Sequence, residues 1–260
     1  QWERQGIKVA LSARTYIENV TEKLETMMGV TSFPTHPTPM RDVYHPEMDD
    51  TPFLDTVGAS KYRAIIGSAN WIITLGRFDI AYATNALRRF NMSPREGHMK
   101  AAQHMFGYLK KFAKGRIVID PNYRDNEKFQ AKVGTHDNWK EFYADAEEDI
   151  PFNLIAPLGL PARITIYKDA DHAHDLLTRR SVTGILLMVN NTPVKWISKR
   201  QKTVETSTYG SEMVAGRVAT ELAIEYRNTL RLLGVPIDGP ALMLGDNQSV
   251  VLSTTVPSSV

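Results

Sequence analysis

The hydrophobic positions of the first 58 residues change from a short strand pattern to a helix pattern. Residues 7–11 are mostly apolar and predict a strand. Apolar residues then recur every three or four positions up to Gly29, which predicts an amphipathic helix that ends at this glycine. Residues 31–58 are rich in proline and acidic residues. This composition predicts an extended linker.

Residues 59–113 carry apolar positions at helical spacing in three consecutive segments. We expect Ser60 to cap the first helix and Asp79 the second. The third segment has Ser93 followed by Pro94, with Glu96 three positions after the serine, a combination typical of a helix start. A strand at 116–120 follows, and residues 121–160 are polar and acidic. The sequence therefore predicts three parts: 1–58, a mainly helical 59–155, and 156–260.

The last hundred residues contain apolar runs of strand length. They predict strands at 163–169, 182–190, 193–198 and 240–246, a helix at 208–233, and a second helix starting at 247. The turn residues Asn190-Asn191-Thr192-Pro193 join two of these strands in a hairpin. Three strands, a helix, a strand and a helix predict an α/β fold with a mixed sheet.

Composition excludes several kinds of chemistry. The 260 residues include no cysteine, which excludes disulfides, zinc–thiolate sites and cysteine nucleophiles. No apolar run is long enough for a transmembrane helix. The formal net charge of +2 is too small to indicate a nucleic-acid partner, so any basic surface must be local. The chain opens without methionine at Gln1, and we expect it to be a piece of a longer polypeptide.

Three acids carry the candidate chemistry. Asp169 and Asp246 each end an apolar strand-like run, and Glu212 lies early in the long helix. Carboxylates that converge from these places repel one another unless a cation lies between them. Such a group suits Mg²⁺-dependent phosphodiester cleavage, in which two ions about 3.5–4 Å apart activate a water and neutralise the leaving oxygen. Alternatively, Asp246 could cap the next helix, and Glu212 could be a capping-box acid or an acid that the dipole of its helix favours.

Two assignments of residues near these acids stay open. Asp171 competes with Asp169 as the first ligand, since residues two apart on a strand share a face. His172 and His174 could bind zinc, but no third nitrogen ligand has the required spacing.

Basic and polar residues near these acids could bind a nucleic-acid backbone. Hydroxyl groups at the start of the long helix could contact 2′-OH or phosphate groups, although one of them could serve only as the N-cap. The candidate nucleic-acid-binding residues are Arg179, Arg180, Lys199, Arg200, Lys202, Ser207, Thr208, Asn247 and Gln248.

Six stretches of the second half form a pattern in their order and spacing. They are Asp169-Ala170-Asp171-His172-Ala173, Arg179-Arg180-Ser181-Val182-Thr183-Gly184, Trp196-Ile197-Ser198-Lys199-Arg200-Gln201-Lys202-Thr203-Val204, Ser207-Thr208, Ser211-Glu212 and Asp246-Asn247-Gln248-Ser249. Through these stretches the second half resembles the RNase H domain of copia-type LTR retrotransposon polyproteins. The resemblance implies an RNase H-like mixed sheet with flanking helices. It also implies Mg²⁺, or Mn²⁺, held by Asp169, Glu212 and Asp246, with an RNA–DNA hybrid as substrate.

The first half is similar to the end of the reverse transcriptase region of the same polyproteins. The carrying stretches are Tyr62-Arg63-Ala64-Ile65-Ile66-Gly67-Ser68, Arg77-Phe78-Asp79-Ile80-Ala81-Tyr82-Ala83, Arg89-Phe90 and His98-Met99-Lys100-Ala101-Ala102. This similarity implies a helical thumb or connection region that supports an upstream reverse transcriptase. It further implies a cytoplasmic location in virus-like particles, with the nucleus as an alternative.

Two departures from the family matter. The polymerase motif Tyr-x-Asp-Asp is absent and is expected upstream of Gln1. A fourth metal-proximal residue is expected beyond Val260. The competing functions are therefore an RNase H-type endonuclease, a non-catalytic duplex-binding module, and a decayed copy of such an element.

Overall fold

The computed structural model describes residues 2–42, 44–123 and 147–255. The chain divides into two compact units, Gln1–Ile119 with Asp175–Arg179, and Asp120–His174 with Arg180–Val260. Both units combine helices with a sheet, so the predicted mixed α/β class is confirmed at that level. The three predicted domain ranges stay a prediction, and most of the polar stretch between 121 and 160 lies outside the described residues.

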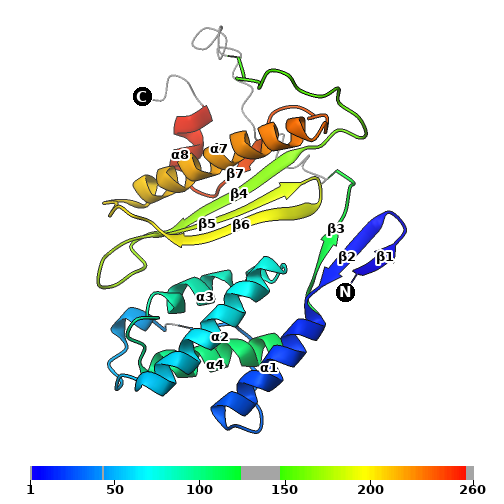
Figure 1. The fold of residues 1–260 in the computed structure, drawn as a ribbon. Coiled ribbons are helices and arrows are strands. Elements are labelled where there is room, and N and C mark those ends of the chain that lie inside the picture. The colour runs from blue at the N-terminus through cyan, green and yellow to red at the C-terminus, as the bar shows by residue number, and fades with distance from the viewer. Residues whose placement is uncertain (1, 43, 124–146, 256–260) are drawn as a thin grey trace. The chain divides into compact units, whose positions relative to one another are not determined.

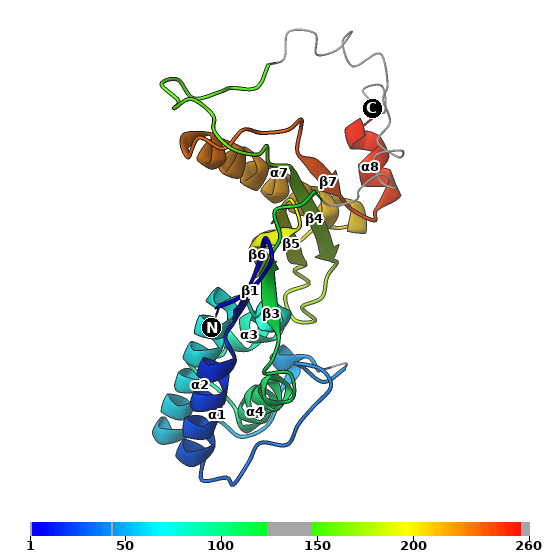
Figure 2. The same cartoon turned by 90° about the vertical axis from the view of Figure 1, so that its right-hand side faces the viewer.

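The first unit packs four α-helices and a three-stranded sheet. Its elements are β1 (Trp2–Gln5), β2 (Lys8–Ser12), α1 (Arg14–Met28), η1 (Pro46–Met48), α2 (Thr56–Thr74), η2 (Phe78–Ile80), α3 (Ala81–Arg88), α4 (Glu96–Lys111) and β3 (Arg116–Ile119). The helix α2 contacts the other three α-helices, as Figure 2 shows for α1 and α4. Fully buried Tyr62, Ile65, Ile66 and Phe106 form the centre of their common core. The expected apolar positions of α2 therefore face inward.

Helix starts in this unit differ from the sequence prediction. Asp55, not Ser60, caps α2, because its carboxylate accepts a hydrogen bond from Gly58 N–H at 2.7 Å. Asp79 caps no helix, since its carboxylate binds Arg77 and Tyr108. By contrast, α1 ends as predicted at Gly29, which adopts the left-handed conformation.

Two further corrections concern segments that pair as strands. The helix α4 begins at Glu96 and not beside Ser93, because backbone bonds tie Pro94 and Glu96 to Leu54 and Pro52 as an extended pair. The strand β1 was not predicted. It is exposed along its whole length, so it shows no alternation of apolar and polar residues.

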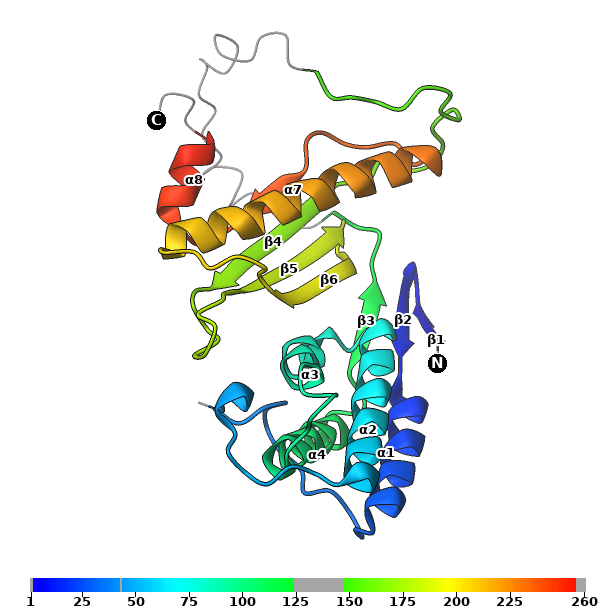
Figure 3. The same cartoon turned by 60° about the vertical axis from the view of Figure 1, so that its left-hand side comes forward.

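The second unit places one long helix on a four-stranded sheet. Its elements are β4 (Ile164–Asp171), β5 (Val182–Val189), β6 (Thr192–Arg200), α7 (Thr208–Leu232), β7 (Leu242–Leu244) and α8 (Gln248–Thr255). The strand order is β6-β5-β4-β7, antiparallel except for β7, which runs parallel to β4 (Figure 1). The helix α7 lies along one face of this sheet (Figure 3). Ile166 and Leu187 from the sheet and Ala219 from the helix are fully buried between these layers.

The order of strands and helices and the predicted hairpin between β5 and β6 are confirmed, but several strand ends differ, and two of these differences concern the candidate acids. The strand β4 continues to Asp171, so Asp169 lies within the strand and not at its end. The strand β7 is shorter than predicted and stops at Leu244, which leaves Asp246 in the connection before α8. Asp169 and Asp246 nevertheless lie near the same end of the paired strands β4 and β7.

Candidate metal site

Parallel pairing of β4 with β7 brings two of the candidate acids together. Tyr167 is the partner of Leu244 in this pair, and Asp169 and Asp246 each follow two residues later. Parallel strands run in the same direction, so equal steps beyond a paired position lead to the same end of the sheet. The topology thus juxtaposes two acids that are far apart in sequence.

The start of α7 supplies the third acid. Ser207 is the N-cap, and its hydroxyl accepts a hydrogen bond from Gly210 N–H at 3.2 Å. Buried Gln201 joins this end of the helix to the sheet, because its Nε2 donates to Thr183 Oγ1 at 3.0 Å and to Ser211 O at 2.9 Å. Glu212, the residue after Ser211, is buried, and its carboxylate faces β4, where Lys168 and Ala170 donate to it. Gln201 thus positions the start of α7 on the sheet, a role that the spacing of apolar residues in the sequence does not indicate.

The three carboxylates converge. One oxygen from each of Asp169, Glu212 and Asp246 lies within 4.8 Å of the others. All three line a cavity of about 540 Å³, together with Asp171, His172, Thr208 and Asn247. Within the part of the chain that the structure describes, the side-chain carboxylates of Asp169 and Asp246 make no hydrogen bond or ion pair, whereas both oxygens of Glu212 accept hydrogen bonds.

The donor set fits a hard divalent cation. Mg²⁺ and Ca²⁺ prefer carboxylate oxygens, and Mg²⁺ keeps several waters, so few protein ligands suffice. The carboxylates of Asp169 and Asp246 line the cavity, and a cation between them would relieve the repulsion of their like charges. The arrangement can therefore hold a divalent ion, and Glu212 would share such an ion with the partners that it already has.

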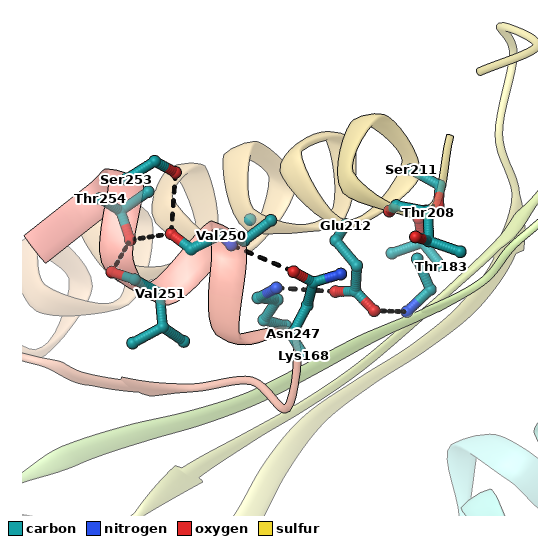
Figure 4. Close-up of polar contacts among 12 residues, drawn as sticks. Lys168, Thr183, Thr208, Ser211, Glu212, Asn247, Val250, Val251, Ser253 and Thr254 are labelled. Carbon is teal, nitrogen blue, oxygen red and sulfur yellow. Dashed lines mark hydrogen bonds and ion pairs between the residues drawn. The ribbon is translucent and has the colours of Figure 1, made fainter. Parts of the chain in front are cut away.

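Those partners of Glu212 are a lysine and a backbone amide. Lys168 Nζ lies 2.7 Å from Glu212 Oε2, and Ala170 N–H donates to Oε1 at 3.1 Å (Figure 4). The side chains of Lys168 and Glu212 are only 4% and 5% exposed. Lys168 had no predicted role. A single lysine in an apolar strand pattern is a signal that could have identified it, because a charged residue in such a strand needs a partner.

Two residues beside the convergent acids have other partners. Asp171 lies on the same strand, but its carboxylate pairs with His174 Nδ1 at 2.6 Å, and it is not one of the three convergent acids. Asn247, not Asp246, caps α8, since its Oδ1 accepts from Val250 N–H at 3.1 Å. The carboxylate of Asp246 is therefore not used as a helix cap.

The candidate nucleic-acid-binding residues occupy three places in the second half of the chain. Thr208 and Asn247 line the carboxylate cavity, Ser207 precedes Thr208 as the N-cap, and exposed Gln248 opens α8. A second group lies at the end of β6 and just after it. A third group lies in the connection between β4 and β5, where Arg179 belongs to the segment that is grouped with the first unit. The second group consists of Lys199, Arg200 and Lys202, and the third of Arg179 and Arg180.

Comparison with known proteins gives distant relatives. No family model matches the chain, and no solved structure matches it. It is 25% identical over 240 residues to the retrovirus-related Pol polyprotein from transposon RE1 of Arabidopsis thaliana. It is 26% identical over 235 residues to the corresponding polyprotein from transposon TNT 1-94 of Nicotiana tabacum. The similarities support a retrotransposon Pol origin.

The coverage of these matches is unequal. The Pol matches include 91% and 90% of this chain but only 13% and 15% of the polyproteins. A secreted RxLR effector protein 161 of Plasmopara viticola is 26% identical over 177 residues, which cover 68% of this chain and 92% of that protein. The chain thus spans less than a sixth of the length of the Pol polyproteins that it matches. Each helix among the described residues is too short or too polar to cross a membrane.

Proposed function

We propose that this chain is the RNase H-type endonuclease segment of a copia-type retrotransposon polyprotein, which hydrolyses the RNA strand of RNA–DNA hybrids. The observation that carries the proposal is the convergence of Asp169, Glu212 and Asp246 within 4.8 Å. These are the positions that the family resemblance assigns to the metal ligands. The mixed sheet with α7 on one face also agrees with an RNase H-like fold.

In this proposal the acids bind Mg²⁺, or Mn²⁺. Two such ions would activate a water and neutralise charge on the leaving oxygen. Asp169 would bridge the ions, Glu212 would hold one of them and Asp246 the other. Thr208 and Asn247 line the same cavity, so their hydroxyl and amide groups would contact the hybrid next to the cleaved bond. The basic residues Lys199, Arg200, Lys202, Arg179 and Arg180 would bind phosphates without reading the sequence.

The rest of the chain would serve the polymerase. Residues 1–58 would be the end of a reverse transcriptase region with its linker, and residues 59–155 a thumb or connection region that contacts the primer–template duplex. The partner would be the upstream reverse transcriptase of the same polyprotein, in cytoplasmic virus-like particles. The Pol similarity across about nine-tenths of the chain supports this arrangement.

The decisive experiment compares two aspartates of β4. Asp169→Asn removes a proposed ligand, whereas Asp171→Asn changes a carboxylate that pairs with His174. We expect Mg²⁺-dependent cleavage of an RNA–DNA hybrid, but not of duplex DNA. We expect Asp169→Asn to lower the cleavage rate by more than the roughly 10–100-fold typical of groups outside the direct ligand shell. Asp171→Asn should change the rate far less. Equal rates for the parent and Asp169→Asn would contradict the site assignment.

A non-catalytic duplex-binding module is the second candidate. The observation that favours it is the ion pair of Glu212 with Lys168, since this pair already neutralises one proposed ligand. In that case the hybrid affinity should survive Asp169→Asn and fall steeply with salt, because phosphate contacts release counterions. Hybrid binding without any cleavage by the parent would favour this candidate over the nuclease.

A further inference from the structure

Lys168 occupies a place where a divalent ion would otherwise meet Glu212. Its ammonium group is 2.7 Å from Glu212 Oε2, and the lysine precedes Asp169 in β4. Both partners are almost fully buried, so water screens this charge pair weakly. The remaining oxygen of Glu212 accepts from Ala170 N–H. A metal ion that binds Oε2 of Glu212 therefore meets the positive charge of Lys168 on the same oxygen.

The neighbouring backbone leaves room for this lysine. A Cβ atom at Gly245 would lie 2.6 Å from Lys168 Cε and 2.9 Å from Nζ, both too close for ordinary contact. Gly245 immediately precedes Asp246, so the lysine tip passes beside the backbone that carries another proposed ligand. Three carboxylates and one ammonium leave a formal charge of −2 at the site, which one divalent ion balances.

We propose that Lys168 competes with a divalent cation for Glu212. The free protein then holds its cation mainly through Asp169 and Asp246, and Glu212 becomes a ligand only when the lysine moves away. Lys168 is thus a residue that limits metal binding. This inference rests on the proposed function, because it takes the three acids as metal ligands.

The test is a set of Mn²⁺ titrations by calorimetry on the full chain. Lys168→Met removes the charge but keeps an unbranched side chain. We expect it to tighten Mn²⁺ binding by about 10- to 100-fold, the range by which groups around a metal site change metal affinity. Adding Glu212→Gln to Lys168→Met should return the affinity to the parent level, because neither the competing cation nor the extra ligand remains. Arg217→Met is the control, since it removes a positive charge that lines a pocket together with Lys168 and Asp246 but pairs with Glu221.

The outcomes separate this inference from the proposed function. If the parent binds Mn²⁺ and Lys168→Met binds it no more tightly, Lys168 does not compete and the inference is overturned, while the metal site stands. If Lys168→Met gains affinity that Glu212→Gln leaves intact, or Arg217→Met gains as much, the inference is also overturned. If neither the parent nor any variant binds Mn²⁺, the metal site itself is wrong.

A second measurement covers the risk to folding. Lys168→Met leaves the buried carboxylate of Glu212 without its cation, which destabilises a folded protein. We expect a lower melting temperature than the parent without metal and a larger rise on addition of Mn²⁺. An unchanged rise would contradict the competition. If Lys168→Met does not fold, Lys168→Gln keeps a hydrogen-bond donor near Glu212 without the charge and provides the same titration.

Discussion

Glu25 and His98 in the first unit have partners from the protein itself, and in this they differ from Asp169 and Asp246 in the second. Glu25 accepts hydrogen bonds from Phe33 N–H at 2.6 Å and from Lys110 Nζ at 2.8 Å. Buried His98 uses both ring nitrogens in hydrogen bonds. In contrast, the carboxylates of Asp169 and Asp246 have no partner among the described residues.

This difference separates groups that stabilise the fold from groups that are available to a ligand. A charge with a complete set of partners favours the folded state, and its removal leaves those partners unsatisfied. Like charges without partners contribute repulsion, which the folded chain tolerates and a bound cation would relieve. Substitution of the two kinds of acid should therefore have opposite effects on stability.

Glu25→Ala should have the largest effect on stability. It removes the acceptor of a buried backbone N–H and the partner of Lys110, so we expect a loss of about 2–4 kcal/mol. Hydrogen exchange of amides in α1 and α4, measured on the full chain, reports this loss for the first unit. Glu25→Gln retains an acceptor for Phe33 N–H and should lose less. Unchanged protection in Glu25→Ala would show that this pair does not stabilise the unit.

His98 should make the first unit sensitive to acid. Its Nδ1 accepts from Arg95 N–H at 3.0 Å and its Nε2 lies 2.8 Å from Pro46 O, which fits a neutral ring with its proton on Nε2. Burial lowers the pKa of His98 below its usual 6.5. The unfolded chain therefore takes up a proton first, and stability falls as pH drops below 6.5, by at most about 1.4 kcal/mol per pH unit for one proton.

Chemical denaturation between pH 7 and pH 5 measures this dependence. His98→Gln should flatten it, although not completely, because burial also lowers the pKa of His104. An identical pH dependence in the parent and in His98→Gln would contradict the assignment of the neutral ring.

Sequence periodicity predicted the elements better than their ends. Apolar residues at helical spacing identified α2, because one face of that helix is fully buried. The starts of helices depended on tertiary contacts that periodicity does not contain. Asp79 has a sequence typical of an N-cap, but Arg77 and Tyr108 engage its carboxylate.

The candidate site was predictable in its acids and not in their surroundings. Asp169 and Asp246 each follow an apolar run, which marks them as candidates. The pairing of β7 with β4, which juxtaposes them, joins strands that are not consecutive in the chain. The ion pair of Lys168 with Glu212 joins residues 44 positions apart. Neither residue shows in sequence that the other is its partner. Only the packing of α7 on β4 brings these two side chains together.

Asp246→Asn should have the smallest effect on stability, and of the opposite sign to Glu25→Ala. Without divalent ions it removes one of three close negative charges that has no partner, so we expect stabilisation of at most about 1 kcal/mol, the energy of two unit charges 4 Å apart in water. Asp238→Asn is the matched control. Asp238 pairs with Arg163 at 2.6 Å, so its substitution should be neutral or slightly destabilising.

Melting temperatures measured with and without Mn²⁺ make this comparison complete. Asp246→Asn should melt slightly above the parent without metal and lose the rise that Mn²⁺ gives the parent, since a ligand stabilises only the state that binds it. Asp238→Asn should keep that rise. If Asp246→Asn destabilised the chain without metal, the carboxylate of Asp246 would have a stabilising role in the fold. The contrast between Asp246 and Glu25 would then no longer hold.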